Sequence, residues 1–199
     1  MPTNHESEAR FREEMSASEK VFSGRLLQVF RDRVILPTGR ETTREYIRHP
    51  GAAVVIPYLG NRHLMLVRQY RYPVARALLE LPAGKIDAGE DPQETITREL
   101  EEETGYAARS IRYLNRFHPC VGYSNELLYL YWASDLVKGS LTPDADEIIE
   151  NVPVPVEEAL DMVFSGVISD AKSIIGILWA DRILRDVEFR QRFEIRLAE

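Results

Sequence analysis

The sequence predicts an α+β or α/β sandwich preceded by a small antiparallel strand appendage. Three observations support this fold class: apolar runs typical of buried strands, an acidic segment bounded by helix caps, and two C-terminal segments with apolar residues at three- and four-residue spacing. The chain has 199 residues, 44% hydrophobic and 29% charged. This length and composition suit one globular domain, or one domain with a small appendage.

The N-terminal region is expected to form the appendage. Residues 1–20 are polar, so we expect them to be frayed. Residues 21–30, 33–36 and 42–48 are typical of short strands, with a turn at Pro37, Thr38 and Gly39 between the second and third. Three short strands are too few to fold well alone. Residues 21–48 are therefore predicted to be an appendage to a larger domain.

Four apolar segments are predicted to form the core strands. Residues 52–59 and 63–70 are separated by Gly60 and Asn61, which indicates a buried hairpin. Residues 110–119 and 126–136 are rich in Tyr, Phe, Leu and Trp, which favour strands.

A helix is predicted over residues 92–104. Asp91 can cap its N-terminus, Pro92 occupies the first helical position and Glu94 the third. Gly105 then follows as a C-terminal stop.

The C-terminal part is predicted to be helical after an acidic loop. The loop covers residues 142–151, and the helical segments are residues 156–166 and 170–186. Residues 186–199 are strongly polar and are expected to be a tail. The main domain is therefore expected over residues 49–185.

The charge is concentrated in one place. The chain carries 25 basic and 32 acidic residues, a net charge of −7, and residues 90–103 hold seven acidic residues against one basic residue. Without a broad basic surface, we expect no nucleic-acid partner. The apolar stretches are too short to cross a bilayer, so we expect no membrane insertion. A single cysteine, Cys120, and four scattered histidines predict a reducing, cytoplasmic setting and no zinc site.

The acidic helix places several carboxylates on one face. Residues three and four apart share a helix face, so Glu99 converges with Glu102 and Glu103, while Glu101 points elsewhere. Arg98 is the local cation. Such like charges repel unless a cation joins them, and Mg²⁺ or Mn²⁺ prefers carboxylate oxygens. The alternative is a solvated helix face, the usual place of a charge run.

A wider spacing pattern starts at Gly84 and runs through Glu90, Arg98, Glu99, Leu100, Glu102 and Glu103 to Gly105. It resembles the Nudix box, G-x5-E-x7-R-E-U-x-E-E-x-G-U, where U is a bulky apolar residue. Tyr106 stands where the last position is usually aliphatic. The resemblance implies a mixed sheet between helices and hydrolysis of a nucleoside diphosphate linked to another moiety.

The resemblance also implies a metal site. Glu99 and Glu103 would be the principal ligands, Glu102 would contribute directly or through water, and the carbonyl of Ala83 would be a further ligand. A diphosphate is itself anionic, so carboxylates can hold it only through bridging cations. The implied cofactor is Mg²⁺, with Mn²⁺ as a substitute.

Further catalytic roles follow from the same resemblance. Glu90 and Arg98 would form a pair that orients the loop and Glu99. Relatives supply a glutamate base from the loop after the later strands, and Glu147 matches that position. The alternatives in this loop are Asp144, Asp146 and Glu150, or a solvated loop without a base.

The flanks, over residues 21–179, are similar to the ADP-ribose pyrophosphatase branch. This similarity implies a homodimer with exchanged N-terminal strands, acting on a small nucleoside diphosphate sugar. Arg44 and Glu45 would reach the substrate from the partner, Arg71 would contact the diphosphate, and Glu80 and Glu126 would contact metal or ribose. The alternative for these five residues is surface ion pairing.

Substrate choice and catalysis stay open at this point. Val121 stands where ADP-ribose-specific members usually carry proline, so GDP-mannose and other nucleoside diphosphate sugars are alternatives. A non-catalytic sensor of nucleotide sugars is a second alternative, although all the box glutamates are present. A Ca²⁺-binding acidic helix is a third, without the alternating loop ligands of an EF-hand.

Overall fold

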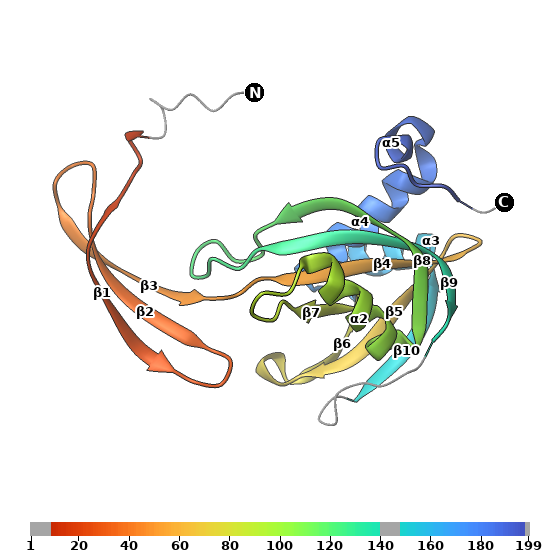
Figure 1. Ribbon diagram of the computed structural model, residues 1–199, viewed down its shortest axis with the longest axis horizontal. Coiled ribbons are helices and arrows are strands. Elements are labelled where there is room, and N and C mark those ends of the chain that lie inside the picture. Colours follow the sequence, from red (N-terminus) through yellow and green to blue (C-terminus); the bar gives the residue numbers. More distant parts are fainter. Residues whose placement is uncertain (1–8, 140–147, 198–199) are drawn as a thin grey trace. The chain divides into compact units, whose positions relative to one another are not determined.

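The computed structural model describes residues 9–139 and 148–197 and divides the chain into two compact units. The N-terminal unit comprises Met1–His49 together with Cys120–Glu126. The main unit comprises Pro50–Pro119 and Leu127–Glu199 (Figure 1). The loop 120–126 therefore belongs with the N-terminal strands, although it lies far from them in the sequence.

The N-terminal unit contains a three-stranded antiparallel sheet. Its strands are β1 (Glu14–Ser23), β2 (Gln28–Ile35) and β3 (Glu41–Arg48), in that order across the sheet. The turn between β2 and β3 contains Gly39 at φ 81°, as its sequence predicts.

Strand β1 begins at Glu14, so the expectation of a frayed segment over residues 1–20 is corrected from Glu14 onward. The run at residues 21–30 is also divided, because Gly24 donates a hydrogen bond to the carbonyl of Leu27 in a turn between β1 and β2. The polar side chains of β1 do not prevent strand formation. As an edge strand, β1 is held by backbone hydrogen bonds to β2, and its side chains need not be apolar.

The main unit is built on a mixed seven-stranded sheet with the order β10-β5-β4-β9-β8, in which β6 also pairs with β5 and β7 with β4. The pair of β4 and β9 is parallel, and the other pairs are antiparallel. The strands are β4 (Ala52–Gly60), β5 (His63–Arg71), β6 (Arg76–Glu80), β7 (Ala83–Lys85), β8 (Tyr106–Phe117), β9 (Leu128–Lys138) and β10 (Ile149–Pro155). A short 3₁₀ turn, η1 (Tyr72–Val74), joins β5 to β6.

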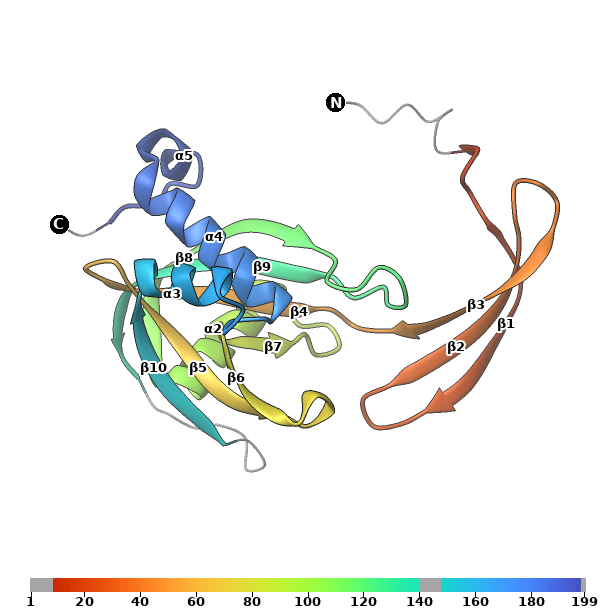
Figure 2. The ribbon, with the colours of Figure 1, turned by 180° about the vertical axis from the view of Figure 1, so that it is seen from behind.

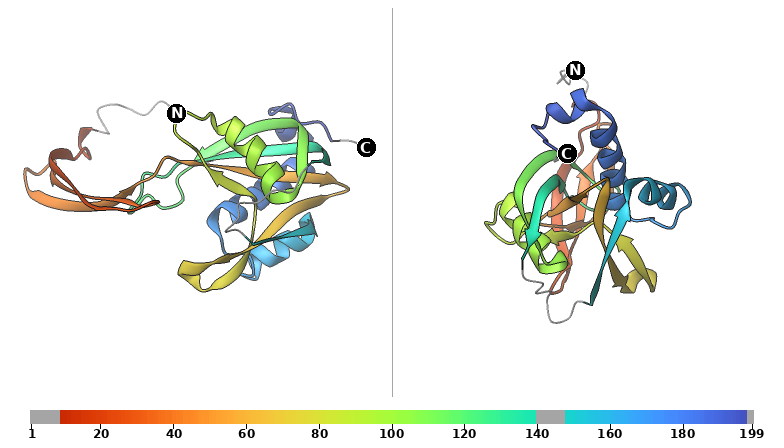
Figure 3. Two further views of the ribbon diagram at one scale, coloured as in Figure 1. Left: turned by 60° about the horizontal axis from the view of Figure 1, so that its bottom comes forward. Right: turned by 90° about the vertical axis from the view of Figure 1, so that its right-hand side faces the viewer.

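Helices cover both faces of this sheet. Helix α2 (Pro92–Thr104) packs Ile96 and Leu100 against the face formed by Ala53, Val55 and Tyr131. Helices α3 (Val156–Phe164) and α4 (Ala171–Arg185) pack on the opposite face, which holds the larger core. Figure 2 shows α3 and α4 in front of the sheet, and Figure 3 shows α2 on its other side. The predicted sandwich with a mixed sheet is confirmed.

The C-terminal segment is more ordered than its polarity indicates. Helix α5 (Val187–Gln191) follows α4, and Ile195 is only 5% exposed. The rings of Phe189 and Phe193 pack against Trp179 of α4, with centroids 5.4 and 5.6 Å from that of the indole. The expected polar tail over residues 186–199 is therefore corrected, because widely spaced apolar side chains anchor it to the core. No helix of the described residues is long and apolar enough to cross a membrane.

Candidate active site

Helix α2, which carries most of the box residues and is called the box helix below, has both of its ends fixed by capping residues. The carboxylate of Asp91 accepts a hydrogen bond from the amide of Gln93 at 2.8 Å, and Glu94 completes a capping box with the amide of Asp91. At the other end, Gly105 has φ 71° and donates its amide to the carbonyl of Glu101. Both ends match the sequence prediction.

The buried face of α2 fixes Glu103 beside β7. Ile96 and Leu100 are fully buried against the sheet, and Glu103, one turn after Leu100, is only 4% exposed. Its Oε2 accepts a hydrogen bond from the amide of Ala83 at 3.2 Å. The structure therefore brings together Glu103 and Ala83, two of the predicted metal ligands.

Gly84 leaves room for Glu99. A Cβ atom placed on Gly84 would lie 2.0 Å from both Cδ and Oε1 of Glu99. The carboxylate of Glu99 therefore lies directly over the backbone of β7. The box glycine is required here by this close approach, and not by an unusual φ.

Arg98 gathers three of the box carboxylates. Its Nη1 donates to Oε1 of Glu99 at 2.9 Å and to Oε2 of Glu102 at 2.8 Å. Its Nε and Nη2 each lie 3.4 Å from the carboxylate of Glu90. The hydroxyl of Thr95 also donates to Glu90, at 2.8 Å.

These contacts shift the pKa values of Glu90 and Arg98 in opposite directions. The hydrogen bonds from Thr95 and then from Arg98 hold the pKa of Glu90 below its usual range. Burial alone would lower the pKa of Arg98, but its contacts with Glu90, Glu99 and Glu102 raise it above its ordinary value. Both groups are therefore charged at neutral pH, and Arg98 supports the orientation of Glu90 and Glu99 that the sequence predicts.

The donor set fits a hard divalent cation, because Glu99, Glu102, Glu103 and the carbonyl of Ala83 supply only oxygen. Within residues 9–139 and 148–197, however, no three acidic, histidine or cysteine side chains are grouped closely enough to hold a metal ion as they stand. The reason is visible in the contacts: Arg98 holds Glu99 and Glu102, while Glu103 accepts from a backbone amide. A metal ion held there would have to compete with these contacts for the carboxylate oxygens.

A second charged cluster, which the sequence did not reveal as a unit, surrounds Glu80. Glu80 is 2% exposed. Its carboxylate accepts hydrogen bonds from Nε and Nη2 of Arg71 at 2.9 and 2.8 Å, and also one from Nζ of Lys172. Nζ of Lys172 also contacts Asp170 at 2.8 Å.

The Glu80 cluster is tied to the backbone through Ser173. The hydroxyl of Ser173 donates to Asp170 at 2.6 Å and accepts from the amide of Leu81 at 2.7 Å. Burial would raise the pKa of Glu80, but the hydrogen bonds from Arg71 and Lys172 outweigh it and hold that pKa below its usual range. The one available sequence signal was the D-A-K-S stretch at the start of a helix, where Asp170 is the N-cap.

The remaining predicted residues lie elsewhere. Arg44 pairs with Glu13 at 2.6 Å and Glu45 with Arg31 at 3.0 Å, both in the N-terminal unit. In the same unit, Oε1 of Glu126 lies 3.6 Å from Nδ1 of His49. Glu147, Asp144 and Asp146 lie outside the described residues. Glu150, in β10, is exposed and pairs with Arg68 at 2.9 Å.

The chain is similar to several known proteins. Residues 47–174 match the NUDIX domain. The chain is 38% identical over 169 residues to a methanol dehydrogenase activator of Bacillus methanolicus, covering 84% of this chain and 91% of that protein. It is 36% identical over 167 residues to an ADP-ribose pyrophosphatase of Bacillus subtilis, covering 83% and 90%.

Two further similarities bear on specificity and fold. A GDP-mannose pyrophosphatase of Yersinia enterocolitica is 33% identical over 144 residues, covering 68% of this chain and 75% of that protein. A solved structure described as an ADP compounds hydrolase superposes with a TM-score of 0.79 at 24% identity, covering 91% of this chain and 97% of the other. At that identity the solved structure supports the fold alone.

Proposed function

Because the chain belongs to the NUDIX family, we propose that it hydrolyses the diphosphate of ADP-ribose or of a related nucleoside diphosphate sugar, releasing a nucleoside monophosphate and a sugar phosphate. One observation carries this proposal: Glu99 and Glu103 of the box helix are both held against β7, beside Gly84 and Ala83. These oxygen donors come from two neighbouring elements, which supports a site where a diphosphate could be bridged through cations.

The proposed cofactor is Mg²⁺, for which Mn²⁺ can substitute. Glu99 and Glu103, together with the carbonyl of Ala83, would hold it, and Glu102 would contribute directly or through water. Such an ion neutralises the diphosphate and lowers the pKa of a bound water. In this proposal Arg98 keeps Glu90 and Glu99 oriented, which its hydrogen bonds to both support.

Arg71, Glu80 and Glu147 have different roles in this proposal. Arg71 is held by its ion pair with Glu80, and its side chain is still 40% exposed. An accessible arginine of this kind suits a contact with the diphosphate. Glu80 itself is so buried and paired that a positioning role is favoured over direct contact with metal or ribose. Glu147 remains the proposed general base by resemblance alone.

We further propose a homodimer in which Arg44 and Glu45 of one protomer reach the substrate of the other, while Glu126 contacts metal or ribose. The exposure of Phe22, Leu26 and Met15 in that unit, each more than half exposed, supports a partner surface. A cytoplasmic location is proposed from the single cysteine.

The second candidate is a GDP-mannose pyrophosphatase. Two observations favour it: Val121 in place of the proline, and the similarity to the Yersinia enzyme. A non-catalytic sensor is disfavoured because every box glutamate is present.

The direct test is a hydrolysis screen with Mg²⁺ and Mn²⁺ over ADP-ribose, GDP-mannose, UDP-glucose, NADH and diadenosine polyphosphates. Release of AMP from ADP-ribose is the expected result. Glu99→Gln and Glu103→Gln should each lower turnover by roughly 100-fold or more, since a cation supplies several kcal/mol of charge stabilisation.

The matched control is Glu101→Gln, the same change on the same helix but off that face, which should keep near-normal turnover. All three variants should unfold at the temperature of the parent protein. A near-normal rate for Glu103→Gln at saturating Mg²⁺ would remove the metal assignment. Tight binding of ADP-ribose without AMP release would instead identify a sensor.

A further inference from the structure

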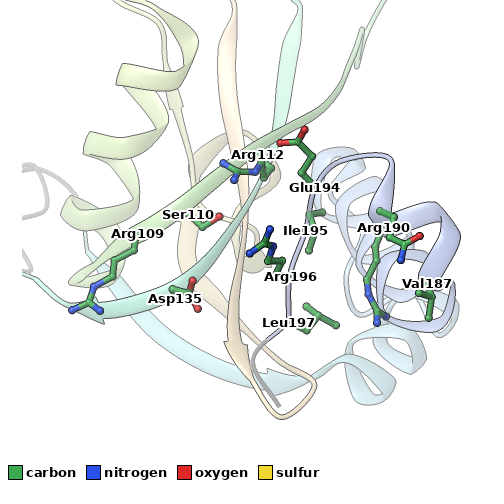
Figure 4. A pocket seen from close by; sticks show the side chains of 11 residues that line it. Arg109, Ser110, Arg112, Asp135, Val187, Arg190, Glu194, Ile195, Arg196 and Leu197 are labelled. Atoms are coloured by element: carbon green, nitrogen blue, oxygen red, sulfur yellow. The ribbon is translucent and has the colours of Figure 1, made fainter.

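A cavity of about 960 Å³ lies in the main unit, between β8, β9 and the C-terminal segment. Figure 4 shows Arg112 and Ser110 entering it from β8, and Arg196 extending toward them from the C-terminal segment. Arg109 and Arg190 lie at its two sides (Figure 4). Its volume falls within the range of roughly 300 to 1,000 Å³ that is typical of small-molecule sites.

The cavity carries an excess of positive charge. Four arginines line it, against two carboxylates, those of Asp135 and Glu194. Within residues 9–139 and 148–197, no ion pair joins any of these four arginines to a carboxylate, whereas Arg62, Arg68, Arg71 and Arg98 of the same unit are all paired. An excess of arginines over carboxylates in one cavity, with no ion pair between them, favours the binding of an anion.

Arg112 is the most informative of the four. Its Nη1 donates to the carbonyl of Ile111 at 3.2 Å, but its Nε is buried and has no hydrogen-bond partner among the described residues. Buried donors in folded proteins are nearly always satisfied. Because Nε is enclosed by protein atoms, the donors that Arg112 can offer to a group in the cavity are those at the end of its guanidinium.

The cavity also has an apolar side. Val187, Ile195 and Leu197 contribute to its lining. An inorganic anion would make no use of these side chains, while an organic group could pack against them.

We propose that this cavity binds a phosphomonoester attached to an organic group, such as a nucleoside monophosphate or a sugar phosphate. A phosphomonoester carries about −1.5 to −2 charges at neutral pH, which matches the excess of the lining, and its oxygens accept the fork of donors that arginine offers. The organic group occupies the apolar side.

The site is separate from the box carboxylates. Arg112 pairs in register with Trp132, whose side chain belongs to the core under α3 and α4, while the neighbouring Ile111 packs on the α2 side. The cavity therefore opens on the face of the sheet opposite to α2. Binding there needs neither a metal nor the box glutamates, so its test is independent of the proposed hydrolysis.

The test titrates the full chain with AMP, ribose 5-phosphate, inorganic phosphate and adenosine in EDTA, by calorimetry and by ¹H–¹⁵N spectra. We expect AMP and ribose 5-phosphate to bind, inorganic phosphate to bind more weakly and adenosine not to bind. The amide signals of Ser110, Arg112 and Ile195 should shift, and those of residues 98–103 should not.

Arg112→Gln and Arg196→Gln should each weaken AMP binding by roughly tenfold, the loss expected for one charge-assisted hydrogen bond. The matched control is Arg116→Gln, because Arg116 is exposed on the same strand but does not line the cavity. Since Arg196 is exposed, its variant tests the site even if Arg112→Gln fails to fold.

Three results would overturn the proposal. One is unchanged AMP affinity in folded Arg196→Gln. Another is a set of shifts confined to residues 98–103. The third is adenosine or inorganic phosphate binding as tightly as AMP, which would exclude the phosphate contact or the apolar contact respectively.

Discussion

Two charged clusters of the main unit differ in how their charges are balanced. Around Arg98, three carboxylates share one guanidinium, and the side chain of Arg98 is 38% exposed. Around Glu80, two carboxylates face two cations, Arg71 and Lys172, and the side chain of Glu80 is 3% exposed. The first cluster is anionic and accessible, while the second is neutral and buried.

The difference indicates that the Arg98 cluster can bind a ligand, whereas the Glu80 cluster stabilises the fold. A buried cluster must be neutral and fully hydrogen-bonded, because an unpaired charge in the interior is costly. The cluster of Glu80, Asp170, Arg71 and Lys172 meets this condition. It also links Leu81 to α4, because the hydroxyl of Ser173 accepts a hydrogen bond from the Leu81 amide. An accessible cluster can keep excess negative charge, which leaves it able to bind an added cation.

Removing one charge from each cluster should give the largest difference in the free energy of unfolding. Lys172→Met should lower the free energy of unfolding by roughly 3 kcal/mol, because it leaves two carboxylates sharing too little positive charge in a buried site. Glu99→Gln should change it by less than about 0.5 kcal/mol, since it removes one of several repelling charges near the surface. Urea unfolding measures both.

Lys138→Met is the matched control for Lys172→Met, because Lys138 is exposed in β9. It should leave stability unchanged. A Lys172→Met variant as stable as the parent protein would show that the buried cluster does not stabilise the fold.

A second contrast uses two glycines, Gly84 and Gly176, at which an added Cβ atom would clash with a neighbouring side chain. In Gly84→Ala the new Cβ would displace the carboxylate of Glu99, which lies 2.0 Å away at the end of a flexible side chain. We expect roughly 100-fold lower turnover, as for a catalytic group moved by about 1 Å, with little loss of stability.

Gly176→Ala serves as the comparison, because its Cβ would lie 2.2 Å from Cδ1 of Leu81 inside the core. It should cost about 1 to 3 kcal/mol of stability through overpacking. Steady-state hydrolysis and thermal unfolding of both variants separate the two effects. Normal turnover in Gly84→Ala would contradict the placement of Glu99 over β7.

The smallest expected effect is on acid stability. The pKa of Glu80 is lowered from an ordinary value of 4.5 in the folded protein. Its ion pairs therefore stabilise the fold fully above that ordinary value, and this contribution is lost as the pH falls through the lower folded-state pKa. Urea unfolding from roughly pH 6 to pH 3 should show a loss on the order of 1 kcal/mol that is absent in Glu80→Gln.

Salt distinguishes this effect from that of a surface pair. The pKa of Glu157 is also lowered, by its hydrogen bond from Arg62, but its side chain is 55% exposed. High salt should screen the Glu157 contribution and leave that of Glu80 nearly unchanged. Equal salt sensitivity would contradict the burial of Glu80.

The sequence by itself determined the ends and the acidic face of the box helix. Asp91, Pro92 and Gly105 set the helix ends, and the three- and four-residue spacing set the face of Glu99, Glu102 and Glu103. These features depend on contacts within one helix, so local sequence is enough to predict them. The spacing from Gly84 to Gly105 then indicated the family, which residues 47–174 confirm.

Only the tertiary structure decided the partners of those residues. Glu80 and Lys172 are separated by 92 positions, and nothing in either local sequence shows that they meet. The same holds for Ser173 under Leu81, and for Arg196 opposite Arg112 across the cavity. Polar segments such as β1 and the C-terminal segment were also misjudged. The physical reason is the same in each case. Hydrogen bonds to distant strands and packing against distant side chains decide whether these segments are ordered and which residues pair. Neither kind of contact produces a periodic pattern in the local sequence.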